Sequence, residues 1–249
     1  MLATLNTNSV RAGKWHSLMD KVYRQDNLIS AYREVAANKG APGVDNITIE
    51  DFGAGLQRNI DKLEQHLRDG TYGPQAIRRV HIPKPGTNET RPLGIPTVRD
   101  RVVQAALRHV LEPILERQFA EHSYGFRPDR GCKDALRRVD TLLRGGHRYT
   151  VDVDLKSYFD TIPHDRLIAE LRKYVADNSV IALVEKFLQA DIMDGLDRWT
   201  PTSGAPQGAI ISPLLSNLYL NDLDHLMASS GYEMTRYADD RAPGNVCVR

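Results

Sequence analysis

Cysteine is scarce in this sequence of 249 residues, which contains only Cys132 and Cys247. Two thiols cannot build a disulfide framework or a zinc site with four cysteine ligands, so small disulfide scaffolds and cysteine-based zinc modules are excluded. Long hydrophobic runs are also missing, since no apolar stretch approaches the roughly 20 residues that span a bilayer. The N-terminal segment lacks the charged start and apolar centre of a signal peptide. We therefore expect a cytoplasmic protein without a membrane partner.

A large net charge is absent as well, because 33 Lys and Arg residues nearly balance 32 Asp and Glu residues, for a formal charge of +1 at pH 7. Total charge therefore does not indicate a nucleic-acid partner. The distribution is less even, since residues 68–108 hold eight Lys and Arg against three Asp and Glu. Such a local excess either binds a polyanion, with release of its counterions, or forms a solvated basic face. Composition leaves both interpretations open.

What is present suffices for a folded core, since 41% of the residues are hydrophobic and the length suits one or two domains. Apolar residues recur at helical spacing through the first 70 residues, and Thr48 with Asp51 resembles a capping box. Residues 76–82 and 91–96 flank Pro85-Gly86 and predict a basic hairpin. Further helices are predicted over 101–119 with an interruption at Pro113, 132–143, 164–174, 179–190 and Pro213 to about Met227, and strands over 149–155 and 232–238.

Acidic residues lie at the ends of both later strands. Asp152 and Asp154 share one face of the first strand, and the second leads directly into Asp239 and Asp240. Carboxylates are ligands that Mg²⁺ prefers, and two such ions about 3.5–4 Å apart can activate a hydroxyl and stabilise a phosphate leaving group. Taken alone, an Asp-Asp pair in a turn is more often merely solvated, so both interpretations stay open.

Longer motifs accompany these aspartates in a fixed order, and they are more specific than the aspartates themselves. Three of them resemble the palm motifs of reverse transcriptases: Asp154–Asp160, Ser203–Gly208 and Tyr237–Asp240. Three further segments upstream are similar to the bacterial group II intron type: Gly40–Asp45, Arg91–Gln104 and His122–Pro128. The resemblance runs from about Tyr32 to Asp240, so a chance match is very improbable.

The resemblance implies an α+β fold with right-hand polymerase architecture. Residues 1–110 would form helical fingers with the basic hairpin, and residues 111–240 a partial palm with an antiparallel sheet and a fingers-proximal loop at 122–130. The implied activity is RNA-directed DNA polymerisation for a group II intron, with a second role as the intron's maturase. The implied partners are an RNA template, the intron RNA, a DNA primer and dNTPs.

The same resemblance assigns the catalytic and metal-binding positions to Asp154, Asp239 and Asp240, with two Mg²⁺ ions as cofactor. Asp154 rather than Asp152 matches the first aspartate because an aromatic residue, Phe159, follows it five positions later. Face and spacing alone could not separate the two, and Asp152 is expected to be a neighbouring structural acid.

Four residues match positions that contact the incoming nucleotide. Lys84 and Arg91, on the two arms of the hairpin, would hold its triphosphate, since cations are the natural partners of that charge. Phe159 matches a steric gate against a ribose 2′-hydroxyl, with an ordinary core aromatic as the alternative. Gln207 matches a residue beside the nascent base pair, and the small residues around it, Gly204, Ala205 and Gly208, would permit close backbone approach.

Three arginines are candidates for template binding, each with a structural alternative. Arg78 and Arg79 either touch template phosphates or lie on a solvated strand face. Arg127 either binds template or pins its own loop, and the sequence does not choose between these.

The match ends after Asp240, and residues 241–249 form a tail unlike the family. Pro243 cannot donate to a sheet ladder, so only Val246-Cys247-Val248 could form a strand there. We expect a truncated or frameshifted fragment that lacks the return strand beside Asp239–Asp240 and the thumb. Two alternatives to a polymerase remain: a non-catalytic RNA-binding remnant, and another two-metal enzyme such as a nuclease, against which the Pro-Gln-Gly and fingers motifs argue.

Overall fold

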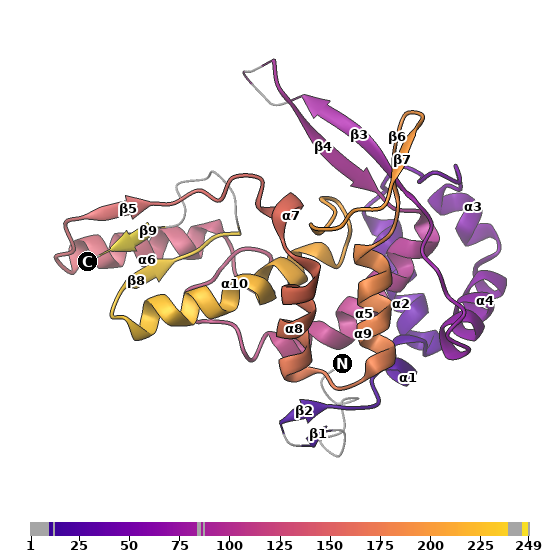
Figure 1. Ribbon diagram of the computed structural model, residues 1–249, viewed down its shortest axis with the longest axis horizontal. Coiled ribbons are helices and arrows are strands. Elements are labelled where there is room, and N and C mark those ends of the chain that lie inside the picture. The colour runs from indigo at the N-terminus through magenta and orange to yellow at the C-terminus, as the bar shows by residue number, and fades with distance from the viewer. Residues whose placement is uncertain (1–9, 12, 84–85, 87, 239–245, 249) are drawn as a thin grey trace.

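The computed structural model describes residues 10–11, 13–83, 86, 88–238 and 246–248. The molecule is elongated, with a helical half that carries a projecting hairpin and a second half built around a small sheet (Figure 1). In the described part of the chain, every helix is too short or too polar to cross a bilayer.

The helical half is built around one long buried helix. This helix, α5, begins at Val98, where Thr97 accepts a hydrogen bond from the Asp100 amide as its N-cap. It continues through Pro113 to Leu115, so the predicted interruption at Pro113 is wrong. The capping box of Thr48 and Asp51 is confirmed. The helices before α5 are α1 (Met19–Val22), α2 (Gln25–Ala37), α3 (Ile49–Ala54) and α4 (Leu56–Arg68).

The basic hairpin is confirmed, and it belongs to a larger sheet than the sequence predicted. Strands β3 (Ile77–Pro83) and β4 (Thr90–Ile95) pair antiparallel. A second hairpin, β6 (Ile192–Asp194) with β7 (Asp197–Trp199), joins β3 through a parallel pairing. The order is therefore β4-β3-β6-β7, with β3–β4 projecting away from the body of the molecule (Figure 1). Near the N-terminus, β1 (Val10–Arg11) and β2 (Lys14–Trp15) form a separate short ladder.

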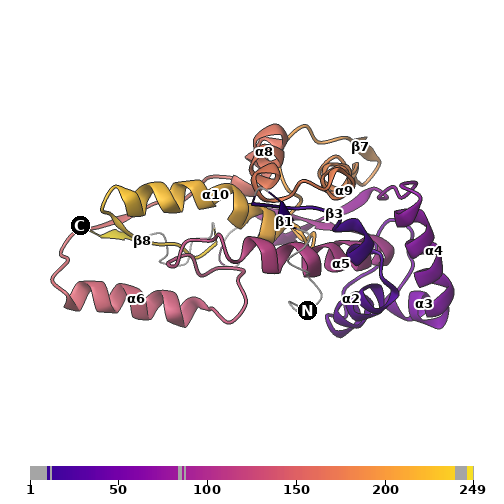
Figure 2. The ribbon, with the colours of Figure 1, turned by 90° about the horizontal axis from the view of Figure 1, so that it is seen from below.

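The second sheet has the order β5-β9-β8, from strands Thr150–Asp152, Val246–Val248 and Glu233–Thr235. Strand β9 pairs antiparallel with both neighbours, so β5 and β8 run parallel to each other. The expected lack of a return strand is therefore wrong, because Val246–Val248 supplies it. Strand β8 lies between helices α6 (Cys132–Arg144) and α10 (Ser212–Ser229) (Figure 2).

One hydrophobic core joins the two halves. The remaining helices of the described residues are α7 (Tyr158–Thr161), α8 (His164–Tyr174) and α9 (Asn178–Leu188). The core contains residues from the first helix through α10, among them Leu18, Val103, Phe159, Leu171, Val184 and Leu215. The fingers and palm boundary predicted at residue 110 falls inside α5, which runs unbroken across it.

Candidate active site

The sheet topology makes the chain leave β5, just before Asp154, and β8, just before Tyr237 and Ala238, at the same end of the sheet. Asp152 of β5 lies opposite Val246 of β9, which in turn lies opposite Thr235 of β8. Because β5 and β8 run in the same direction, the chain leaves both at the same end of the sheet. Asp154, exposed, follows β5 by two residues. Asp239 and Asp240 lie outside the described residues, four and five positions after Thr235.

These carboxylates suit a hard divalent ion, although the described residues alone do not form a metal cluster. Within the ranges that the structure describes, no group of three His, Cys, Asp or Glu side chains is placed to hold a metal. Asp154 would be one ligand, and the other two candidates, Asp239 and Asp240, lie outside the described residues. An all-oxygen set of three carboxylates fits Mg²⁺, which keeps few protein ligands and fills the remainder with water and substrate phosphate.

Phe159 belongs to α7 and packs against the loop before α10. Its ring is buried, packing edge-on against Tyr158 at 5.6 Å and Phe126 at 6.4 Å between centroids. Its carbonyl accepts a hydrogen bond from the Ala205 amide at 2.7 Å. Gly204, at φ 92°, lies so close to α7 that an added Cβ would be 2.9 Å from the Phe159 oxygen. Phe159 therefore packs as a core aromatic does, at the position where the resemblance implies a steric gate against the ribose 2′-hydroxyl.

The close backbone approach predicted for the Pro-Gln-Gly loop is confirmed. The Gly94 amide of β4 donates to the Gln207 carbonyl at 2.6 Å. Gly208, at φ 101°, packs so tightly that an added Cβ would come within 2.3 Å of the Gly94 oxygen. The basic hairpin and the Pro-Gln-Gly loop therefore meet main chain to main chain, which fixes the position of one relative to the other.

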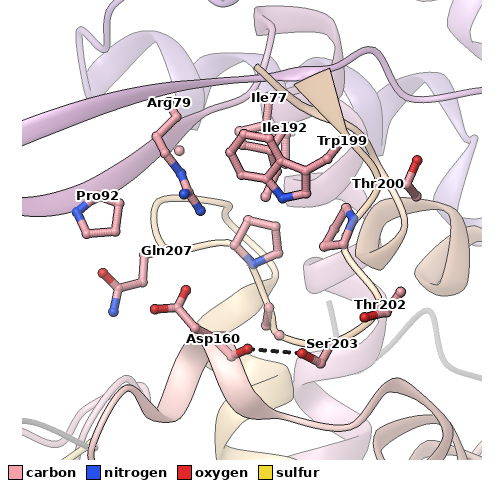
Figure 3. Close-up of a pocket in the computed structure, with 15 residues that line it drawn as sticks. Ile77, Arg79, Pro92, Asp160, Ile192, Trp199, Thr200, Thr202, Ser203 and Gln207 are labelled. Carbon is pink, nitrogen blue, oxygen red and sulfur yellow. Dashed lines mark hydrogen bonds between the residues drawn. The ribbon is translucent and has the colours of Figure 1, made fainter. Parts of the chain in front are cut away.

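A cavity of about 430 Å³ opens between these two elements and the β6–β7 hairpin. Figure 3 shows the side chains of Arg79, Trp199, Gln207 and Asp160 around it. The Arg79 guanidinium lies over the Trp199 ring, 4.8 Å from its centroid. Asp160 also lines this cavity, and its carbonyl accepts a hydrogen bond from the Ser203 hydroxyl at 3.2 Å.

The other candidate cations differ in what they contact. Arg91 is exposed on β4, opposite Ile82 of β3. Lys84 lies outside the described residues. Arg78 donates to the Pro42 carbonyl at 2.7 Å and so holds the Gly40–Asp45 loop against the hairpin.

Arg127 is buried and bound by its own surroundings. It donates to both oxygens of Glu116, at 3.0 and 3.1 Å from Nε and 2.7 Å from Nη2. Its Nη1 donates to the carbonyls of Ala120 and Ser123. Of the two roles left open by the sequence, these contacts favour pinning the loop.

The 122–130 loop also contains His122, which is partly buried. Burial lowers the pKa of His122, and the neighbouring Arg138 guanidinium lowers it further. Because the neutral form is favoured, the loop gains no additional positive charge near pH 7.

Two groups of residues near the site were not identified from the sequence. Trp199 lies in the short strand β7, which pairs with β6, and β6 in turn pairs with the distant strand β3. Arg236, two positions before Ala238, forms a buried polar cluster with Asp224 and Asn217 of α10. The sequence signal for the cluster was an arginine inside a predicted strand, two positions before Ala238.

Comparison with known proteins finds similarity over most of this chain. The family described as "Reverse transcriptase (RNA-dependent DNA polymerase)" matches residues 82–242. The group II intron-encoded protein LtrA of Lactococcus lactis subsp. cremoris is 39% identical over 220 residues, which cover 88% of this chain and 36% of LtrA. Protein YkfC of Escherichia coli (strain K12) is 40% identical over 219 residues, covering 84% of this chain and 56% of YkfC. The chain thus spans between about a third and just over half of these relatives.

Solved structures resemble the fold at low sequence identity. A partial Cas6-RT-Cas1–Cas2 complex aligns with a TM-score of 0.56 and 21% identity over 94% of this chain and 38% of the other. A sicinivirus 3Dpol RNA-dependent RNA polymerase aligns with a TM-score of 0.54 and 15% identity over 75% of this chain and 43% of the other. At these identities the likeness shows the fold alone.

Proposed function

The chain belongs to the reverse transcriptase family, in its group II intron-encoded branch, and from that premise we propose that it carries out RNA-directed DNA synthesis and serves its intron as a maturase. It has the right-hand polymerase fold. The observation that supports the catalytic part of the proposal is the parallel direction of β5 and β8, because the chain leaves both strands at the same end of the sheet, toward Asp154 in one case and toward Ala238 in the other.

In this proposal the three aspartates hold two Mg²⁺ ions, in keeping with the family's general use of divalent metals. When bound, the ions supply activation of the primer 3′-hydroxyl and stabilisation of the departing pyrophosphate. Asp154, Asp239 and Asp240 fix the position of that chemistry at the end of the sheet. Lys84 and Arg91 hold the triphosphate of the incoming dNTP, and Gln207 lies beside the new base pair.

The template would pass along the cavity that Arg79 and Trp199 line beside the Pro-Gln-Gly loop. Arg79 stacked on Trp199 offers a cation and an aromatic plane to a single-stranded nucleic acid, and bases stack on such surfaces with little sequence preference. Template RNA bound there and a DNA primer at the aspartates are the proposed substrates. Arg78 and Arg127 contribute less to template binding, since both guanidinium groups already bind protein atoms.

Primer extension by one nucleotide tests this function. A DNA primer annealed to an RNA template is mixed with the protein, one dNTP and Mg²⁺, then quenched and resolved by length. We expect addition of the complementary dNTP only, and none with EDTA. Template binding without extension would instead favour the non-catalytic RNA-binding remnant. Strand cleavage that does not depend on dNTPs would favour a nuclease.

Replacing Phe159 with valine tests the proposed gate. The smaller side chain should admit the ribose 2′-hydroxyl, so the preference for dNTPs over rNTPs, as a ratio of kcat/KM values, should fall roughly 10- to 200-fold. The matched control is Phe187→Val, which shortens an equally buried aromatic of the same core on α9. Equal selectivity in both variants and the parent would leave Phe159 as a core aromatic only.

Replacing the hairpin cations one at a time distinguishes residues that bind the incoming nucleotide from residues that bind the template. Arg91→Ala, and likewise Lys84→Ala, should raise the KM for dNTPs while RNA affinity changes little. Arg79→Ala should weaken RNA binding and reduce the slope of log K against log salt by about 1. Arg58→Ala, which removes an exposed cation from α4, is the control. Loss of RNA affinity alone in Arg91→Ala would contradict the triphosphate role.

A further inference from the structure

Arg236 directly follows β8 and is buried, with 1% of its surface exposed. It forms a two-point ion pair with Asp224 of α10, from Nε to Oδ1 at 2.9 Å and from Nη2 to Oδ2 at 2.7 Å. Its other bonds go to Asn217 Oδ1 at 2.9 Å and Ser123 Oγ at 2.6 Å. The guanidinium is therefore neutralised and bonded on three sides, as a buried charge requires.

The same guanidinium reaches the last described residue before Asp239. Nη1 of Arg236 also donates to the Ala238 carbonyl at 3.4 Å. Ala238 is buried at φ 55°, in the left-handed region that non-glycine residues seldom adopt. Such a backbone persists only where the surroundings enforce it. Here the enforcing groups are Arg236 and Gly125, whose hypothetical Cβ would come within 2.1 Å of the Ala238 nitrogen.

The loop that contains Gly125 is tied to the same cluster. The Arg236 amide donates to the His122 carbonyl at 3.0 Å, and the Tyr124 amide donates to the Arg236 carbonyl at 2.8 Å. Asn217 Nδ2 donates to the Gly125 carbonyl at 2.8 Å. Helix α10, this loop and the chain after β8 are thus joined through two side chains, Arg236 and Asn217.

We propose that Arg236, braced by Asp224 and Asn217, is a positioning residue that fixes the backbone of Ala238, the residue from which the chain continues into the proposed metal-binding pair Asp239–Asp240. The proposal rests on the proposed function, since it assumes that Asp239 binds metal. Stability alone does not explain an arginine here, because a buried ion pair generally stabilises a fold no better than well-packed apolar residues of similar volume. Control of a left-handed backbone beside a metal ligand gives a reason for it.

Binding of Mn²⁺, measured from the electron paramagnetic resonance signal of the free ion, tests the proposal without relying on activity. Arg236→Lys keeps the charge opposite Asp224, yet one ammonium cannot replace a planar fork that reaches Asp224, Asn217, Ser123 and Ala238. Asn217→Ala leaves the ion pair intact and carries the test if Arg236→Lys does not fold. Both should raise the Mn²⁺ dissociation constant roughly 10-fold or more, with RNA affinity unchanged.

Two matched controls distinguish the positioning of Ala238 from a general contribution to the stability of β8 and α10. Arg138→Lys alters another arginine bridge to β8, through Glu233, that does not contact Ala238. Asn221→Ala removes a buried asparagine one turn along α10, bonded to the 118–120 segment instead. Both controls should bind Mn²⁺ as the parent does, measured well below each variant's unfolding temperature.

The possible outcomes distinguish failure of the positioning role from failure of the proposed metal site. If Arg236→Lys and Asn217→Ala bind Mn²⁺ as tightly as the parent, or the controls weaken equally, the positioning role is overturned while the proposed metal site stands. If the parent binds no Mn²⁺, or Asp154→Asn does not weaken its binding, the proposed site itself fails and the positioning role fails with it.

Discussion

Replacing Asp154 with asparagine should reduce the rate of nucleotide addition roughly 1,000-fold or more, since loss of a metal-binding carboxylate removes several kcal/mol of transition-state stabilisation. The change is nearly isosteric and the side chain is exposed, so folding and RNA affinity should be preserved. The measurement is the single-turnover rate of addition of one dNTP to a primer annealed to RNA, beside the RNA dissociation constant.

The matched control is Asp152→Asn, two residues earlier and also exposed. The sequence could not separate these two aspartates by face. The structure places Asp152 within β5, paired with Val246, and Asp154 beyond the strand's end. Asp152→Asn should therefore retain most of the activity. If Asp152→Asn abolished addition while Asp154→Asn did not, the catalytic assignment would move to Asp152.

Replacing Gly208 with alanine should disable the enzyme from a position that carries no functional group. A left-handed backbone costs a non-glycine residue about 1–2 kcal/mol, and forcing a side chain into a packed space adds about 1–3 kcal/mol. The new Cβ would overlap the Gly94 oxygen and separate the hairpin from the Pro-Gln-Gly loop. A displacement of about 1 Å in a catalytic arrangement can lower kcat/KM roughly 100-fold.

Two glycine controls separate the cost of the left-handed backbone from the cost of the steric overlap. Gly73→Ala adds a Cβ in open space, and Gly70→Ala adds one in open space at φ 70°. Gly73→Ala should match the parent, and Gly70→Ala should lose stability without losing activity. The readouts are the free energy of unfolding in denaturant and kcat/KM for the dNTP. Full activity of Gly208→Ala would show that the joint between hairpin and loop does not set the site's geometry.

Local signals predicted the parts of the fold whose cause is local. The β3–β4 hairpin followed from alternation around Pro85-Gly86, and the α8 bounds His164–Tyr174 agree with the predicted helix. Strands β6 and β7 were missed because three-residue strands carry little pattern of their own, and β6 depends on pairing with Ile77 and Arg78 more than 100 positions away. The pairing of β9 with β5, which lies more than 90 positions earlier, is non-local in the same way.

The site was predictable in its motifs and less so in its contacts. Glycine positions in the Pro-Gln-Gly loop were identified correctly, because only glycine tolerates both positive φ and close backbone approach. The role of Arg127 could not be read from its sequence, since it depends on where Glu116 and two carbonyls lie. Arg236 was missed because arginine is rarely buried, so its place inside a predicted strand was not enough to identify it as an interior residue.

Fe²⁺-directed cleavage is the most direct test of the central claim, that Asp154 and the Asp239–Asp240 pair form one metal site. Fe²⁺ substituted for Mg²⁺, with ascorbate and peroxide, generates hydroxyl radicals that cut the backbone beside the ion, and the fragments are identified by mass. The account predicts cuts in two segments far apart in sequence, around residue 154 and around residues 239–240, both suppressed by excess Mg²⁺ and both lost in Asp154→Asn. Cuts in only one segment, or cuts at 239–240 that persist in Asp154→Asn, would contradict it.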